Sequence, residues 1–218
     1  ITMLLHILGS CSGTEPMPGR DYTSWILEEN DGGLLWFDAG GGCASHAYAK
    51  GLSPLKVKVL FLSHPHLDHT AGLPGIFQAI RKEKWLRGDR EFRELPCHTS
   101  APEVIAAADA FLKADAAVGD EWDFTPVVRV YTGDVGSLDE LAAWLEQPTE
   151  LLMAETGHHR AAELCALVRA RHWPVRRLLF LHHGLEILRD PAGEKAKADA
   201  AWGAGVLFAS DGMTVPLG

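Results

Sequence analysis

Short apolar runs recur over the first 62 residues, and turn-forming residues separate them. Runs rich in β-branched and aromatic residues are typical of buried strands. Asp31, Gly32 and Gly33 form a turn signal between the second and third runs. The pattern therefore predicts strands over residues 3–8, 22–29, 34–38 and 57–62.

Longer segments with helical periodicity follow, and strands alternate with them. Pro74 stands in the first turn of one such segment, where a missing backbone N–H is tolerated. Ser100–Glu103 and Ser137–Glu140 each place a serine three residues before a glutamate, which is the capping-box pattern of a helix start. We expect helices over 74–86, about 101–114, 137 to about 146 and 160–172, and strands over 150–154 and 177–181.

The end of the chain carries a hairpin signal, because Val206–Ala209 and Met213–Val215 flank the dipeptide Asp211-Gly212. Strands early in the chain, followed by alternating helices and strands, predict an α/β protein. Two sheets would pack face to face with helices outside, as a four-layer αββα sandwich. No linker divides the chain, so residues 1–218 are interpreted as a single domain.

The densest cluster of chemically active side chains follows the predicted strand over 57–62. His64, His66, Asp68 and His69 place three imidazoles and a carboxylate within six residues. Neutral imidazoles bind Zn²⁺, Mn²⁺ and Fe²⁺, and a carboxylate favours the harder of these ions. Packing offers no reason to crowd such groups on one loop, so we interpret the motif as a metal site.

The spacing within the motif divides the ligands into two pairs. His64 and His66 lie two residues apart in an extended stretch and project to one side, while Asp68 and His69 can face a second ion. Two ions about 3.5–4 Å apart can share a hydroxide and hold the attacking and leaving oxygens of a displacement.

Six segments of the chain resemble, in order, those of the metallo-β-lactamase superfamily, and within it the ribonuclease Z and phosphodiesterase branch. They are Leu8–Thr14, Leu34–Gly40, His64–His69, Val130–Asp134, Leu151–Thr156 and Arg177–His182. The resemblance implies the metallo-β-lactamase-like αββα fold, with Asp38 in support of the ligands. It implies two divalent transition-metal ions, with zinc as the first choice and manganese or iron as alternatives.

The resemblance also assigns roles to individual residues. The metal ligands are expected to be His64, His66, Asp68, His69, Asp134 and His182. Asp68 is also counted among the catalytic residues. Glu155 is expected to orient a proton-donating histidine, with His159 as the first choice and His158 as the alternative.

One expected ligand has no counterpart. The family places a further metal histidine between the helix near 101–114 and Asp134, whereas this chain passes directly from Val127 to Val128. A hairpin's worth of residues is missing at this point compared with the family. His98 lies in the interval and is interpreted as an ordinary strand-end residue rather than as a substitute ligand.

Composition narrows the class of substrate. The net charge of −9 disfavours a long nucleic acid, since an acidic surface repels the phosphate backbone. No apolar run reaches membrane-spanning length. The four cysteines are scattered without C-x-x-C spacing and are read as reduced thiols, so we expect a cytoplasmic protein without a membrane partner.

These features predict a metal-dependent hydrolase that cleaves a phosphodiester by attack of a hydroxide bound to the metal. The expected partner is a small-molecule phosphodiester, and the oligomeric state is left open with a homodimer as one option. Two alternatives remain. One is hydrolysis of a thioester or lactone at the same site, and the other is a degenerate metal-binding or regulatory protein.

Overall fold

The computed structural model describes residues 3–15, 17–99, 101–114, 122–130, 145 and 148–217. Its larger sheet has the strand order β10-β1-β2-β3-β4-β5-β6. The strands are β1 (Met3–Gly9), β2 (Ser24–Glu28), β3 (Leu34–Phe37), β4 (Val57–Leu62), β5 (Glu94–Thr99), β6 (Thr125–Val130) and β10 (Thr214–Leu217). The pairs from β10 to β3 are antiparallel, whereas those from β3 to β6 are parallel.

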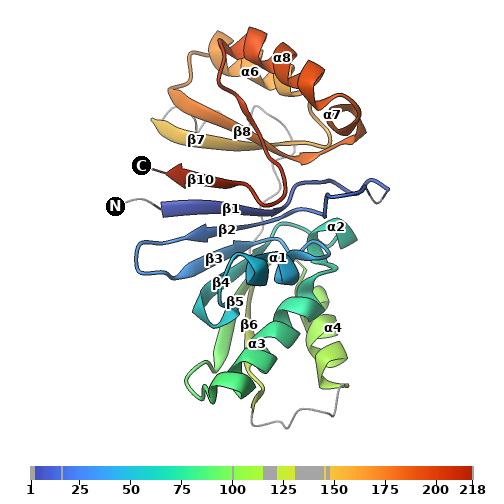
Figure 1. Ribbon diagram of the computed structural model, residues 1–218, viewed down its shortest axis with the longest axis vertical. Helices are drawn as coiled ribbons and strands as arrows, with labels where there is room; N and C mark the ends of the chain where they lie inside the picture. The colour runs from blue at the N-terminus through green and yellow to red at the C-terminus, as the bar shows by residue number, and fades with distance from the viewer. Residues whose placement is uncertain are drawn as a thin grey trace.

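Helices cover one face of this sheet, because alternate strand residues are apolar on that side. Ile26, Trp36 and Leu60 are almost fully buried in one cluster with Phe77 and Ile105. The helical elements between these strands are α1 (Cys43–Ala49), the 3₁₀ turn η1 (Pro54–Lys56), α2 (Leu67–Thr70), α3 (Leu73–Arg87) and α4 (Pro102–Lys113). Figure 1 shows α1, α3 and α4 on the same side of the strands.

The smaller sheet has the order β7-β8-β9 and is wholly parallel. It is built from β7 (Thr149–Thr156), β8 (Val175–His183) and β9 (Leu207–Phe208), with the helices α6 (Ala161–Ala170), α7 (Leu185–Arg189) and α8 (Pro191–Trp202). Leu164 and Val168 of α6 and Ala198 of α8 pack on Leu178 and Phe180 of β8. These helices lie on the side of the small sheet that faces away from the large sheet (Figure 1).

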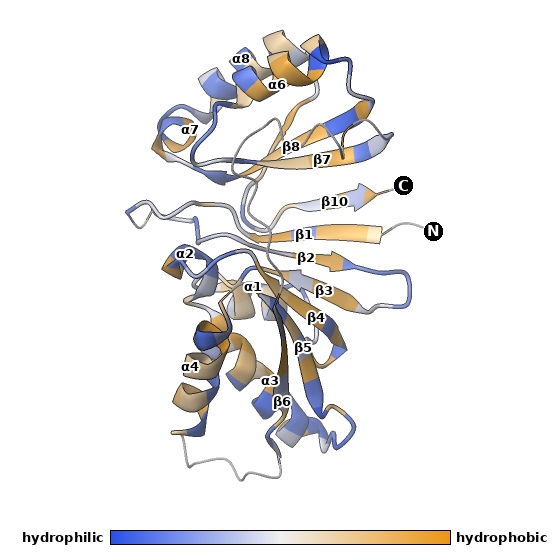
Figure 2. Cartoon of the chain, turned by 180° about the vertical axis from the view of Figure 1, so that it is seen from behind, coloured by the Kyte–Doolittle hydropathy of each residue, from blue (hydrophilic) through white to orange (hydrophobic). Residues whose placement is uncertain are grey.

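The two sheets meet through their remaining faces. Leu5 and Ile7 of β1 pack with Leu179 and Leu181 of β8 and with Val215 of β10. Figure 2 shows β1 and β7 as largely hydrophobic, whereas the loop joining β2 to β3 is hydrophilic. The order helices, sheet, sheet, helices is the four-layer αββα sandwich that the sequence predicts.

The expected hairpin around Asp211-Gly212 is wrong. The strand before it, β9, pairs with β8 in the small sheet, and β10 after it pairs with β1 in the large one. The Asp211 side chain accepts from Ser10 Oγ and from the Asp21 N–H, and Gly212 N–H donates to the Ile7 carbonyl. These non-local bonds carry the chain from one sheet to the other, which a local turn signal does not reveal.

The other predicted strands are confirmed with small shifts at their ends, as are the helices over 74–86, 101–114 and 160–172. The predicted helix over 137–146 lies almost entirely outside the described residues. The position of the expected insertion, between Val127 and Val128, falls inside β6, which pairs with β5 without a break from Thr125 to Val130. No described helix is long and apolar enough to cross a membrane.

Candidate metal centre

The histidine motif stands at the carboxyl end of β4, as the sequence predicts. The strand ends at Leu62, and α2 begins at Leu67. Asp68 and His69 are buried in α2, whereas His66 is exposed at the position preceding it. The short helix therefore turns two of the four ligand candidates inward and leaves His66 at the rim.

Asp38 anchors the buried part of the motif. Its carboxylate accepts from the Ser63 N–H at 2.8 Å, the Ser63 hydroxyl at 2.9 Å and His69 Nδ1 at 2.8 Å. Its backbone has φ 54°, a left-handed conformation that costs an ordinary side chain about 1–2 kcal/mol. These three bonds hold the aspartate in the strained conformation, and they place it in direct support of His69.

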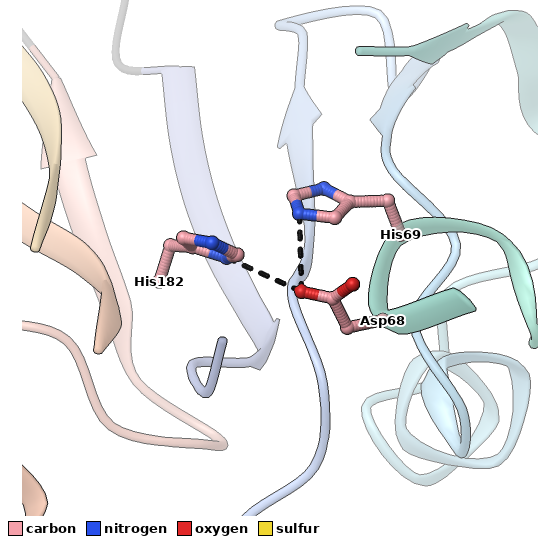
Figure 3. Close-up of side chains that lie close together, drawn as sticks. All are labelled: Asp68, His69 and His182. Carbon is pink, nitrogen blue, oxygen red and sulfur yellow. Dashed lines mark ion pairs between the residues drawn. The ribbon is translucent and has the colours of Figure 1, made fainter. Parts of the chain in front are cut away.

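The tautomer of His69 follows from this contact. A carboxylate only accepts, so Nδ1 carries the proton and Nε2 presents its lone pair. Nε2 is buried without a hydrogen-bond partner among the described residues and lies 3.3 Å from Asp68 Oδ2 (Figure 3). Two acceptor atoms facing each other in a buried site are poorly satisfied unless a cation lies beside them. The orphaned nitrogen therefore fits a metal ligand.

His182 reaches the same point from the second sheet because β8 is irregular at its end. Glu155 pairs with Leu181 and Thr156 with His183, so His182 is the unpaired residue of a bulge, with φ 53°. A bulge redirects one side chain out of the alternating pattern. Figure 3 shows His182 and His69 both directed at the same oxygen of the Asp68 carboxylate, and His182 Nδ1 lies 4.0 Å from that Oδ2.

The protonation of His182 is also determined by its neighbours. The Thr23 hydroxyl donates to the Cys11 carbonyl at 2.7 Å, so it accepts from His182 Nδ1, also at 2.7 Å. Nε2 is then the nitrogen whose lone pair remains available. Burial, with the nearby His69, lowers the pKa of His182 to about 4, so the ring is neutral near pH 7. Sequence reasoning identified His182 but not the threonine that orients it.

The tight packing around His182 requires a glycine at position 157. A Cβ at Gly157 would lie 2.9 Å from Cδ2 and 3.1 Å from Nε2 of His182. Any side chain there would press on the imidazole ring of His182. The glycine is thus needed for close approach of the loop after β7.

His64 and His66 form the outer part of the group. His64 Nε2 lies 3.2 Å from His66 Nδ1, and the rings of His64 and His69 have centroids 4.0 Å apart. Burial lowers the pKa of His64. The structure thus brings Asp68, His69 and His182 together, with His64 and His66 lining the adjoining cavities, whereas Asp134 lies outside the described residues.

Glu155 stands beside this centre at the end of β7. Its Oε2 accepts from the N–H groups of Gly157 and His158 at 2.6 and 2.9 Å. Its Oε1 lies 3.2 Å from His158 Nδ1 and 3.7 Å from His159 Nε2. The ring of His158 has its centroid 6.3 Å from that of His182. Of the two histidines considered from sequence, His158 is therefore the one that Glu155 holds more closely.

Two adjoining cavities open on the histidines. The larger, of about 650 Å³, is lined by Thr23, Trp25, Asp38, Ser63, His64, Pro65, His66, His69, Met153, Glu155, His158, Leu181 and His182. The smaller, of about 340 Å³, is lined by Ser12, Gly13, His64, His66, Asp68, Gly157, His158 and His182. His158 borders both cavities, whereas His159 and His98 border neither.

The four cysteines do not contribute a nucleophile. Cys11, Cys43, Cys97 and Cys165 are all buried as free thiols. Burial raises the pKa of Cys43 and of Cys97 to about 12 and that of Cys11 and Cys165 to about 11. They remain protonated near neutral pH, and a protonated thiol is neither a good nucleophile nor a metal ligand.

Asp38→Asn should weaken metal binding about 10- to 100-fold, the usual effect of losing a group that orients a ligand. The amide keeps the volume but replaces one accepting oxygen with a donor, so the contacts to Ser63 and His69 no longer match. Competition with a chelator measures the affinity. Asp109→Asn, on α4 and paired with Lys113, is the control. Unchanged affinity in Asp38→Asn would show that His69 needs no such anchor.

Comparisons with known proteins agree with this architecture. A ribonuclease Z of Pyrococcus abyssi is 35% identical over 101 residues, which are 46% of this chain and 30% of that protein. A ribonuclease Z of Chlamydia muridarum is 35% identical over 149 residues, 64% of this chain and 47% of that protein. The chain thus matches less than half the length of these curated relatives.

Solved structures extend the likeness of fold to nearly the whole chain. The metallo-beta-lactamase fold protein YhfI from Bacillus subtilis has a TM-score of 0.70 at 14% identity, covering 99% of this chain and 100% of that one. The short form of human tRNase Z has a TM-score of 0.69 at 15% identity, covering 99% of each chain. The family model of the metallo-beta-lactamase superfamily matches residues 18–138. Its match spans more than half of the sequence, including the histidine motif and Asp38, so this chain belongs to the metallo-β-lactamase superfamily.

Proposed function

We propose that this protein is a metal-dependent hydrolase that cleaves phosphodiesters. The observation that carries the proposal is the convergence of His69, His182 and Asp68, whose ligand atoms all lie within 4.8 Å of one another. Asp38 and Thr23 hold the two imidazoles with Nδ1 protonated, so both Nε2 atoms are available. The name ribonuclease Z of the relatives supports phosphodiester chemistry.

The residues present fit two divalent transition-metal ions, with zinc as the first choice. Nitrogen and carboxylate donors of this kind bind Zn²⁺, and also Mn²⁺ and Fe²⁺. His64 and His66 would hold one ion, and Asp68, His69 and His182 the other, with Asp134 proposed as the shared ligand. When bound, such ions provide a nucleophile near neutral pH and stabilise negative charge on phosphorus oxygens.

We assign proton donation to His158, with Glu155 as its positioning residue. The leaving oxygen of a phosphodiester gains negative charge as its bond to phosphorus breaks, and a proton from an imidazolium neutralises it. The Glu155 carboxylate, 3.2 Å from His158 Nδ1, accepts from that nitrogen and fixes the direction of the ring. His159, 3.7 Å from the same carboxylate and outside both cavities, is the alternative donor.

The cavities favour a small substrate. Among the described residues that line them, none is lysine or arginine. A protein that grips long RNA neutralises several phosphates with basic side chains, and this chain has a net charge of −9. We therefore propose a small-molecule phosphodiester, with RNA as the alternative that the names of the relatives suggest.

A panel of substrates tests the proposal. Protein reconstituted with Zn²⁺ or Mn²⁺ should hydrolyse an aryl phosphodiester and lose this activity when a chelator removes the metal. A cyclic nucleotide, a precursor transfer RNA, a lactone, a thioester and a β-lactam complete the panel. Faster turnover of the lactone or thioester than of the phosphodiesters would show that the enzyme hydrolyses a carbonyl substrate instead. No turnover of any member by metal-loaded protein would contradict the hydrolase and favour a metal-binding role.

A further inference from the structure

Apolar side chains line the larger cavity together with the polar ones. Trp25, Pro65, Met153 and Leu181 line it together with the histidines, and we call these four residues the apolar wall. Trp25 comes from β2 of the large sheet, whereas Met153 and Leu181 come from β7 and β8 of the small one. The wall is thus formed where the two sheets meet, directly beside the metal ligands.

Trp25 is held rigidly in this wall. Its ring stacks on Phe37 with centroids 3.8 Å apart and planes 6° apart, and Phe37 stacks on Phe61 at 4.7 Å and 12°. The three residues sit opposite one another on β2, β3 and β4. Only partly buried, Trp25 presents an apolar surface to the cavity, and little side-chain entropy remains to be lost on binding.

The two cavities offer different surroundings to the groups attached to phosphorus. The smaller one is bordered by Ser12, Gly13 and Gly157, and His158 lies at the boundary between the two. A leaving oxygen next to His158 can depart into the smaller cavity. With the leaving oxygen on that side, the ester group that stays on phosphorus would lie in the larger cavity, beside the apolar wall.

We propose that the apolar wall binds a flat aromatic group on the retained side of the phosphodiester, and that Trp25 determines this specificity. The inference rests on the proposed function and names its substrate class as aryl or nucleoside phosphodiesters. Flat rings stack favourably on indole, and removal of one such contact typically changes affinity by about 5- to 150-fold. Alkyl esters lack this contact.

Three substrates that share one leaving group isolate the effect. Bis(p-nitrophenyl) phosphate retains an aryl group, thymidine 5′-p-nitrophenyl phosphate retains a nucleoside, and methyl p-nitrophenyl phosphate retains a methyl group. In Trp25→Ala, kcat/KM should fall about 10- to 100-fold for the first two and by less than about 3-fold for the third, mainly through KM. Trp25→Phe should restore most of the loss. The ratio of kcat/KM for the aryl ester to kcat/KM for the nucleoside ester shows whether the wall prefers an aryl group or a nucleoside base.

The matched control is Trp85→Ala, because Trp85 lies on α3 with 51% of its surface exposed and borders neither cavity. Metal content and melting temperature are measured for each variant. An equal loss on all three esters would overturn the proposal, since Trp25 would then act only in positioning the site.

A binding measurement separates this inference from the proposed function. Calorimetric titration of metal-loaded protein with thymidine 5′-monophosphate and with methyl phosphate requires no turnover. If the nucleotide binds more tightly than methyl phosphate and Trp25→Ala removes this difference, the result supports ring binding at the apolar wall even where none of the esters is cleaved. Equal affinities for the two ligands, or no effect of the variant, would overturn it.

Discussion

His69→Ala is expected to remove tightly bound metal from the proposed inner site, formed by Asp68, His69 and His182, and to lower phosphodiester turnover by at least about 10³-fold. The variant deletes the buried Nε2 that has no hydrogen-bond partner in the part of the chain that the structure describes, and it leaves Asp38 and Asp68 without the ring between them. Elemental analysis after reconstitution and dialysis measures the metal, and hydrolysis of an aryl phosphodiester measures turnover.

The matched control for this variant is His98→Ala. His98 lies on β5 against Phe61, with ring centroids 5.0 Å apart, and borders neither cavity. The His98→Ala variant should retain full metal content. If His69→Ala bound as much metal as the control, the inner site would not be a metal site, and both the ligand assignment and the mechanism built on it would fail.

His158→Ala should lower kcat by about 10²- to 10⁴-fold for substrates with poor leaving groups, because general acid catalysis contributes on this scale. The loss should shrink for p-nitrophenyl esters, whose leaving group needs no proton. Metal content should change little, since the proposed inner ligands are Asp68, His69 and His182. The measurement is kcat across a series of leaving groups.

His159→Ala tests the alternative donor in the same assay, and Glu155→Gln tests the orienting carboxylate. With His158 as the donor, His159→Ala should retain most activity, while Glu155→Gln should follow His158→Ala with a smaller loss. The opposite ranking of the two histidines would return the role to His159, as the sequence first suggests. A loss that does not depend on the leaving group would assign His158 to binding rather than proton transfer.

Much of the fold follows from local sequence patterns, since burial of one strand face or one helix stripe imposes a periodicity. The apolar run before Ser63 predicts β4, and the turn chemistry at Asp31–Gly33 predicts the β2–β3 hairpin. β5 is missing from the predicted strand ranges although Leu95 and Cys97 alternate with polar positions, because Pro96 within the run argues against a central strand. That strand forms because β4 pairs with it on one side and β6 on the other.

The sequence alone also determines the chemistry of the site, since the motif from His64 to His69 places ligands on a short loop whatever the rest of the chain does. The tertiary structure decides how these groups are oriented. Asp38 and Thr23 set the tautomers of His69 and His182, although each lies far from its partner in sequence. Such contacts depend on strand register and leave no periodic signal.

Tertiary structure also decides the direction of His182 and the choice of the proton-donating histidine. The bulge that turns His182 inward arises from the pairing of β7 with β8, and the choice between His158 and His159 depends on which ring meets the Glu155 carboxylate and the cavity. The path through Asp211-Gly212 shows the same limit, because the turn signal is local but the partners of β9 and β10 lie in different sheets. The sequence specifies which chemical groups are available and where strands and helices begin. The packing of the two sheets specifies which atoms of the site face one another, because those contacts join residues far apart in the chain.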